Sequence, residues 1–174
     1  LLDKNYKVTV LDNFTFSYNS LLTYMNHKNF NVLKIDVRNH NEVNNIAKKF
    51  DLIIPLAALV GAPLCKLKEK EASDVNLESL KNLVDNMSKN QILIYPTTNS
   101  GYGVGEKDKF CTEETPLNPI SLYGQTKTNA ENYISDHHEN SVRFRLATVF
   151  GCSPRMRLDL LVNDFVLKAV KDKF

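Results

Sequence analysis

Short apolar runs that alternate with longer amphipathic stretches constrain the fold of this chain more than any other feature of its sequence. Three of the runs are close to continuously apolar, which is typical of strands in a parallel sheet whose two faces are both covered. The stretches between them repeat apolar residues at the helical period. Such alternation predicts βαβ units with right-handed crossovers. We therefore expect an α/β fold built on a doubly wound parallel sheet.

The predicted elements follow from these patterns. The strands are rich in Val, Ile and Leu and cover residues 7–12, 31–36, 51–56, 91–96 and 141–147. The helices cover residues 41–50 and 72–89, and a further helix begins close to Tyr123. Residues 1–6 resemble the tail of a helix, so we expect a first strand and a glycine-rich loop to be missing ahead of them. Residues 157–174 are amphipathic and stop without an obvious cap.

Length and composition narrow the class of protein. With 174 residues, 43% of them hydrophobic and 24% charged, the chain is predicted to be one globular domain. A formal charge of +2 provides no basic field for nucleic acid or acidic lipid. Cys65, Cys111 and Cys152 are scattered without a metal-binding spacing, as expected of reduced cytoplasmic thiols. The longest apolar run, residues 52–64, contains two prolines and a glycine and is too short for a membrane span.

Polar or small side chains follow each predicted strand, where doubly wound sheets bind their ligands. Asp12 and Asn13 end the first strand. A carboxylate there accepts hydrogen bonds from an adenosine ribose and repels a 2′-phosphate, which favours NAD over NADP, although an ordinary turn Asp is the alternative. Asp36 ends the next strand, in a position to approach an adenine edge. Ala57 and Ala58 end the third strand and allow either close approach of a cofactor or tight packing of helix on strand.

Two other patterns are interpreted as structural. The glycines of "GYGVG" (101–105) resemble a phosphate-binding loop, but the polar "EKDKF" and then Pro116 follow instead of a helix, so no helix N-terminus would point at a phosphate. The pair His137 and His138 lies at a polar helix end and is expected to be solvated.

Tyr123 and Lys127 lie four residues apart at the start of a predicted helix, and therefore on one face of it. A surface Tyr–Lys pair is common and has little effect on stability. A nearby ammonium would, however, make the phenol more acidic.

Taken together, several motifs resemble the extended short-chain dehydrogenase/reductase family of NAD-dependent nucleotide-sugar epimerases and dehydratases. They are "VLDN", "IDVRN", "PLAALVG", "DVN", "TTNSGYG", "TEETPLNPISLYGQTK" and "RLATVFG", in the order and at the spacing of that family. The family's first strand, its GxxGxxG loop and its later C-terminal part are not seen. The resemblance thus implies that residues 1–174 are a partial NAD-binding domain without the C-terminal substrate domain.

The resemblance also implies roles for individual residues. Thr98, Tyr123 and Lys127 fall on the catalytic positions. Tyr123 and Lys127 also fall on cofactor positions, together with Asp12, Asn13, Asp36, Val37, Leu56, Ala57, Ala58 and Asn76. Thr148 falls on a substrate position, as do Thr98 and Tyr123. No metal is implied.

The implied reaction is oxidation at C4 of a nucleotide-activated sugar, with Tyr123 as base and NAD as hydride acceptor. The dehydratases carry an acid and a base where this chain has Asn99 and Ser100, so 4,6-dehydration is disfavoured. A 4-epimerase or a 4-dehydrogenase remains, and the strings look closest to the GDP-heptose 4-dehydrogenase branch. The alternatives are a non-catalytic dinucleotide-binding scaffold and an inactive fragment of such an enzyme. A homodimer is plausible by resemblance.

Overall fold

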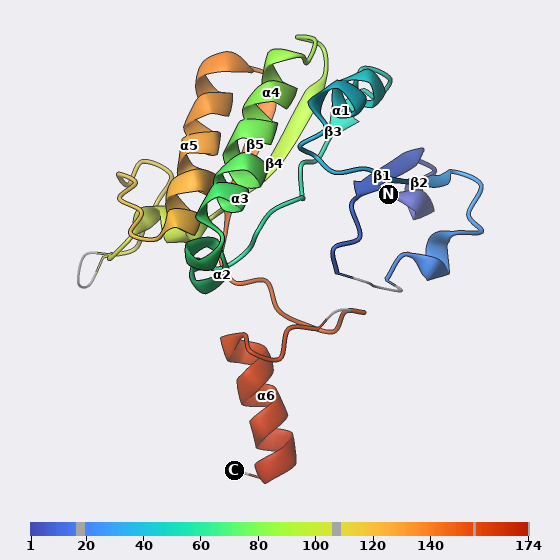
Figure 1. Ribbon diagram of the computed structural model, residues 1–174. Helices are drawn as coiled ribbons and strands as arrows, with labels where there is room; N and C mark the ends of the chain where they lie inside the picture. The colour runs from blue at the N-terminus through green and yellow to red at the C-terminus, as the bar shows by residue number, and fades with distance from the viewer. Residues whose placement is uncertain (17–19, 106–108, 155, 174) are drawn as a thin grey trace. The chain divides into compact units, whose positions relative to one another are not determined.

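The computed structural model describes residues 1–16, 20–105, 109–154 and 156–173. The chain divides into two compact units, residues 35–147 and residues 1–34 with 148–174. Figure 1 shows the elements of each unit. In chain order they are η1 (Leu2–Lys4), β1 (Val8–Asp12), η2 (Leu22–Tyr24), β2 (Phe30–Lys34), α1 (His40–Ala47), β3 (Leu52–Ile53), α2 (Ala62–Leu67), α3 (Glu69–Ser73), η3 (Asp74–Glu78), α4 (Ser79–Asp85), β4 (Ile92–Thr98), η4 (Asn99–Tyr102), α5 (Leu122–His137), β5 (Ser141–Leu146) and α6 (Leu161–Asp172).

The unit of residues 35–147 contains a parallel sheet in the order β3–β4–β5. Alternate residues of β4, including Leu93 and Tyr95, are buried on the sheet face toward which α5 packs (Figure 1). Ala130 and Ile134 of α5 are buried as well. These side chains, with the apolar side of α4, form the core of this unit.

The other face of β4 and β5 carries exposed apolar side chains. Val142, Phe144 and Leu146 point to it, at the alternating positions that a strand dictates, and each is more than two-fifths exposed. The near-continuous apolar pattern of the strands predicts cover on both faces. Within the described residues 35–147, only one face of this strand pair is covered.

The predicted helix 72–89 belongs to a longer helical stretch that begins earlier and ends sooner. It runs from α3 through α4 and contains one π-helical turn, η3. Ser79 Oγ donates a hydrogen bond to the Asp74 carbonyl oxygen (2.8 Å) across this turn. Such π turns are rare and are often found at functional sites. Asn76 lies within it.

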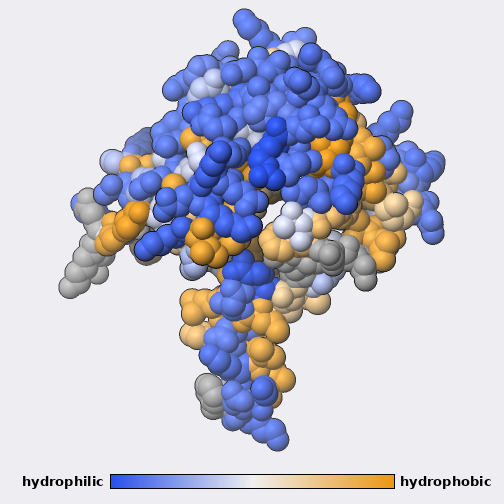
Figure 2. All heavy atoms as spheres, viewed as in Figure 1, coloured by the Kyte–Doolittle hydropathy of each residue, from blue (hydrophilic) through white to orange (hydrophobic). Residues whose placement is uncertain are grey.

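The unit of residues 1–34 and 148–174 contains the parallel pair β1–β2 and the helix α6. The apolar side chains of α6, among them Leu161, Phe165 and Val170, are exposed. Figure 2 shows hydrophobic surface, in orange, along this helix. The prediction of an amphipathic segment at residues 157–173 is consistent with α6, and residue 174 lies outside the described residues.

The predicted α/β class and the parallel direction of the strands are confirmed, with one correction. The parallel pairs are β1–β2 in one unit and β3–β4 and β4–β5 in the other. The third strand is shorter than predicted, because only Leu52 and Ile53 pair with β4. Pro55 lacks the N–H that would continue the ladder, which accounts for the early end.

The prediction that both histidines are solvated is wrong for His138. His137 is exposed and stacks on Tyr133 with ring centroids 3.9 Å apart. His138 is buried, and its Nε2 lies 2.9 Å from the carbonyl oxygen of Gln91. The side chain of Gln91 donates in turn to the carbonyl oxygens of Ala47 and Phe50, so His138 belongs to a buried polar cluster.

Candidate functional site

Thr98 and Tyr123 meet at the carboxyl end of β4. Thr98 is the last residue of the strand, and its Oγ1 accepts a hydrogen bond from the Ser100 backbone N–H (3.2 Å). Its own proton therefore remains free to donate. Tyr123 stands in the first turn of α5, which Ser121 caps by accepting from the Gly124 N–H (3.1 Å). The Thr98 side chain is close enough to the Tyr123 phenol to lower its pKa.

Glycines bring η4 and the segment before α5 close together. A Cβ on Gly124 would lie 3.1 Å from the Ser100 carbonyl oxygen. The Asn118 N–H donates to the Gly101 carbonyl oxygen (2.8 Å). Gly103 has φ +70°, and a Cβ there would lie 2.0 Å from the Asn118 carbonyl oxygen. The "GYG" glycines thus allow this close packing. The "EKDKF" stretch that follows lies partly outside the described residues, at 106–108.

We expect Gly103→Ala to lower the free energy of unfolding by about 2 kcal/mol, because the backbone conformation and the Asn118 oxygen both oppose a side chain. Gly105→Ala is the matched control, since a Cβ there meets nothing within 4 Å. Urea unfolding followed by circular dichroism measures both variants. Equal stability of the two would contradict this account.

Burial raises the pKa of the Tyr123 phenol above its ordinary value. The Thr98 side chain acts in the opposite direction, because it stabilises the phenolate, whereas the nearby Cys65 raises the pKa further. The acidified phenol expected from the sequence is therefore not a property of the chain by itself. That expectation also invoked the positive charge of a nicotinamide, and it stays a prediction.

Lys127 lies one helical turn after Tyr123 and is 6% exposed. Its Nζ stands 4.0 Å from the centroid of the Tyr95 ring. Burial lowers the pKa of the Lys127 ammonium to about 8, and the Glu131 carboxylate opposes the change only in part. Lys127 is therefore a desolvated amine. Perturbed pKa values of this kind are often found at functional residues.

Asn76 holds the loop that follows β3. Its Oδ1 accepts from the Leu59 N–H (2.8 Å) and its Nδ2 donates to the Leu59 carbonyl oxygen (3.0 Å). The amide also reaches Thr126 Oγ1 of α5 (3.4 Å). Asn76 is expected from the resemblance to line the cofactor. In this structure its side chain fixes the backbone of the loop that carries Leu56, Ala57 and Ala58.

The loop at residues 56–58 is open to solvent. Leu56 is 70% exposed, Ala57 is exposed and Ala58 is half-buried. Tight packing of a helix on a strand, the alternative explanation for Ala57 and Ala58, does not apply to the exposed Ala57. That this loop lines a cofactor stays a prediction.

Asp36 and Val37 follow β2 at the beginning of the larger unit, and both are half-buried. The Asp36 carboxylate accepts from Arg38 at both oxygens, from Nε (2.8 Å) and from NH2 (2.7 Å). This bidentate contact fixes the plane of the carboxylate predicted to approach an adenine.

Three predicted residues lie in the other unit. Asp12 ends β1, and its Oδ1 accepts from the Phe14 N–H (2.7 Å). Asn13 Oδ1 accepts from the N–H (3.0 Å) and the hydroxyl (2.8 Å) of Thr15, as in an Asx turn. Thr148 is exposed after β5. Both strand ends thus carry the predicted side chains at their surface.

Sequence reasoning missed four residues around this site. Cys65 is fully buried and donates to the Leu59 carbonyl oxygen (3.2 Å). Glu131 and Arg145 form an ion pair with a shortest distance of 2.7 Å, and their side chains are only 8% and 20% exposed. The face of the Tyr95 ring contacts the Lys127 ammonium. The period of four from Tyr123 through Lys127 to Glu131 was a signal that could have pointed to Glu131.

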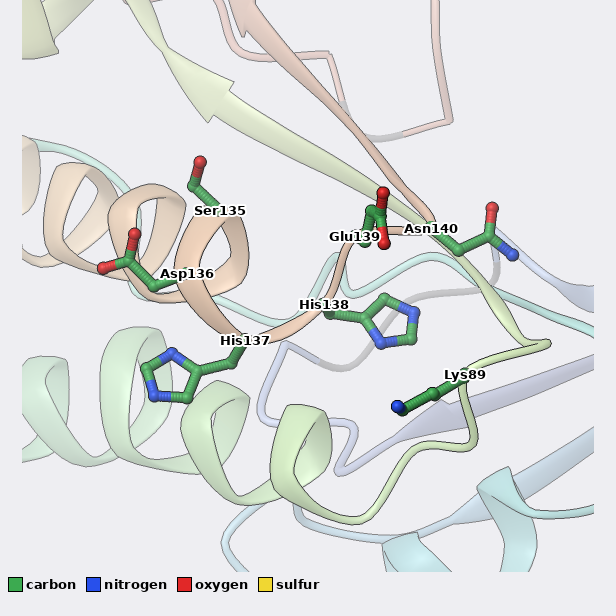
Figure 3. Close-up of a pocket in the computed structure, with 7 residues that line it drawn as sticks. All are labelled: Lys89, Ser135, Asp136, His137, His138, Glu139 and Asn140. Carbon is green, nitrogen blue, oxygen red and sulfur yellow. The ribbon is translucent and has the colours of Figure 1, made fainter.

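A hollow of about 540 Å³ lies at the far end of α5, lined by Lys89, Ser135, Asp136, His137, His138, Glu139 and Asn140 (Figure 3). Its residues come from the last turn of α5 and from the loops before β4 and β5. At 1.5 Å per helical residue, Ser135 lies roughly 18 Å along the helix from Tyr123. This hollow is therefore separate from the Thr98–Tyr123 contact.

Among the described residues, no group of three or more His, Cys, Asp and Glu side chains is arranged to hold a metal ion. The helices of the described part of the chain are all too short or too polar to cross a bilayer.

Comparison with known proteins identifies the class that this fold and site define. The sequence pattern of the NAD dependent epimerase/dehydratase family matches residues 1–172, and the chain belongs to that family. Putative UDP-arabinose 4-epimerase 2 of Arabidopsis thaliana is 29% identical over 91% of the chain and 41% of its own length. The chain spans about half the length of the curated relatives that it matches.

Solved structures confirm the fold. UDP-N-acetylglucosamine 4-epimerase of Methanobrevibacter ruminantium superposes with a TM-score of 0.81 at 22% identity, over 95% of this chain and 56% of the other. dTDP-glucose 4,6-dehydratase of Bacillus anthracis, in complex with NAD, gives 0.79 at 22% identity over 97% and 54%. The predicted family is thus confirmed. The GDP-heptose 4-dehydrogenase branch stays a prediction.

Proposed function

We propose that this chain is the NAD-binding part of an enzyme that oxidises C4 of a nucleotide-activated sugar, as a 4-dehydrogenase or a 4-epimerase. The observation that carries the proposal is that Thr98, at the end of β4, lies beside Tyr123 in the first turn of α5, with Lys127 one helical turn further along that helix. Membership of the NAD dependent epimerase/dehydratase family supports NAD as the cofactor. The exposed loop at residues 56–58 offers an apolar surface that suits a dinucleotide.

In the proposed reaction, Thr98 and Tyr123 act on one hydroxyl of the sugar. The Thr98 hydroxyl orients that group, and the Tyr123 oxygen takes its proton. Bound NAD would supply the hydride acceptor. Because burial raises the pKa of Tyr123, the phenol needs a positive charge close by to act as a base near neutral pH. Lys127 is the cation of α5 that we assign to this task.

Asn99 and Ser100 favour this reaction over 4,6-dehydration. Both follow Thr98 in η4 and both are exposed. An amide and a hydroxyl are poor acid–base groups at neutral pH, and eliminating water needs an acid and a base. Within the remaining reactions, the resemblance to the GDP-heptose 4-dehydrogenase branch supports net oxidation, and the curated relative from Arabidopsis supports 4-epimerisation.

A panel of nucleotide sugars tests the proposal on protein that extends to the length of the relatives. Net release of NADH with a ketone product would identify a 4-dehydrogenase. A mixture of C4 epimers without net NADH would identify a 4-epimerase. Binding of NAD without any turnover across the panel would favour the rival function, a non-catalytic dinucleotide-binding scaffold.

We expect the 174-residue chain itself to bind NAD weakly, with a dissociation constant above about 1 mM, because no GxxGxxG loop is present in its sequence to hold the pyrophosphate. Calorimetric titration with NAD measures this, and Asp36→Ala is the control for specific residual binding. A low-micromolar constant would show that the loop is dispensable.

Assembly and location are part of the proposal. A homodimer through α5 is the expectation from the family, and the outward side chains of that helix are polar, including Gln125, Asn129 and Asn132. The proposed chemistry requires a nucleotide-sugar substrate. We also propose a cytoplasmic location. Sedimentation velocity on the chain tests the dimer directly.

A further inference from the structure

The Lys127 ammonium rests on the face of a buried tyrosine ring. Its Nζ lies 4.0 Å from the centroid of Tyr95, whose side chain comes from the middle of β4 and is only 2% exposed. The negative face of an aromatic ring attracts a cation, and the attraction grows when water is excluded. A buried ammonium without such a partner would be costly. The ring therefore compensates for part of the desolvation of Lys127.

The Glu131 carboxylate compensates for another part of the desolvation of Lys127. It lies one helical turn after Lys127, further along α5 from Tyr123, and raises the pKa of the ammonium. Its carboxylate is also bound by Arg145 of β5, with Nε and NH2 each 2.7 Å from Oε1. Because Arg145 neutralises much of this negative charge, Glu131 compensates only partly for the burial of Lys127.

Other titratable groups bear on this cluster from neighbouring elements. Tyr123 lies in the first turn of the same helix, and its charge would raise the pKa of the Tyr95 phenol. Cys65 of α2 raises the pKa of the Tyr123 phenol. Among the described residues, the Tyr95 hydroxyl has no hydrogen-bond partner. The Tyr95 hydroxyl therefore forms no hydrogen bond within the described part of the chain that would stabilise the fold, whereas the Tyr95 ring contacts Lys127.

We propose that Tyr95 is the residue that positions Lys127: the face of its ring, together with the Glu131 carboxylate, keeps the ammonium charged and in place beside the first turn of α5. Tyr95 has no assigned role in the family resemblance. The inference deepens the proposed function, because it explains how the cation needed by Tyr123 is held. It concerns the chain without cofactor, and its test does not depend on turnover.

The test follows the charge of Lys127 by NMR in the 174-residue chain. Lysine labelled with ¹³C reports the charge of each amine through its Cε shift, and Lys127→Met identifies the signal that belongs to Lys127. Tyr95→Phe keeps the ring and removes only the unpaired hydroxyl. We expect it to leave the titration midpoint of Lys127 within about 0.3 units of the original chain, because the ring supplies the attraction.

Tyr95→Leu removes the ring face and keeps a smaller apolar side chain. We expect it to lower the Lys127 midpoint by about half a unit to one unit, the shift that corresponds to a cation–π contact. A Tyr95→Phe shift as large as that of Tyr95→Leu would overturn the proposal. So would an unchanged midpoint in folded Tyr95→Leu.

Two measurements keep the test decisive if Tyr95→Leu does not fold. In the original chain, the ring current of Tyr95 should move the Lys127 Hε resonances upfield, and ordinary shifts would overturn the proposal. Glu131→Gln should also lower the Lys127 midpoint, because it removes the opposing carboxylate. These results stand whether or not the protein oxidises a nucleotide sugar, so failure of one proposal is distinguishable from failure of the other.

Discussion

Tyr123→Phe is expected to reduce turnover by about 10²- to 10⁴-fold in protein that extends to the length of the relatives, with NAD affinity unchanged. The substitution removes one oxygen, the atom that meets Thr98 and that we assign as the base. The phenyl ring remains in the first turn of α5, so the packing of the helix is preserved. Steady-state kinetics with the preferred nucleotide sugar and a separate NAD titration measure the two effects.

Tyr133→Phe is the matched control on the same helix. Its hydroxyl donates to Asp85 Oδ1 (2.6 Å) at the exterior, away from Thr98. We expect its turnover to equal that of the original enzyme. Full activity in Tyr123→Phe would remove Tyr123 as the base, and equal losses in both variants would point to a general effect on α5.

Arg145→Gln is expected to lower the free energy of unfolding by about 3 kcal/mol, because it leaves the buried Glu131 carboxylate without its partner. Arg145 also donates to the Tyr102 hydroxyl (3.2 Å) and to the Glu113 carbonyl oxygen (2.9 Å), and both bonds would be lost. Urea unfolding measures the change.

Lys81→Gln is the control for this prediction within the same unit. Lys81 pairs with Glu78 on the surface (3.1 Å), and exposed pairs contribute about 0–1 kcal/mol. The double variant Arg145→Gln with Glu131→Gln should recover part of the stability, since the buried Glu131 carboxylate is no longer left without Arg145. A cost for Arg145→Gln as small as that of Lys81→Gln would show that water already reaches Glu131.

Periodicity in the sequence predicted the elements well where one physical requirement dominates. The apolar strands and the helix that carries Tyr123 and Lys127 lie close to their predicted positions because burial demands period 2 or period 3.6. Predictions failed where a single residue mattered. Pro55 shortened the third strand, and His138 turned inward because the Gln91 carbonyl oxygen was there to pair with it.

The residues of the candidate site likewise divide into those that local sequence spacing predicts and those that it does not. The spacing of Tyr123 and Lys127 is local, so the helical period alone places them on one face. Thr98 needed the family resemblance, because it lies on a different element. Tyr95, Cys65 and the pair of Glu131 with Arg145 were not predicted, since each contacts a partner outside its own helix or strand.

The sequence by itself determined the α/β class, the parallel strands and the family, because these depend on repeating patterns and on motifs that are contiguous along the chain. Only the tertiary structure decided which groups surround the Lys127 ammonium and how deeply it is buried. The charge of a buried amine depends on distances to water, to an aromatic face and to carboxylates. Those distances exist only after β4 and α5 have packed together.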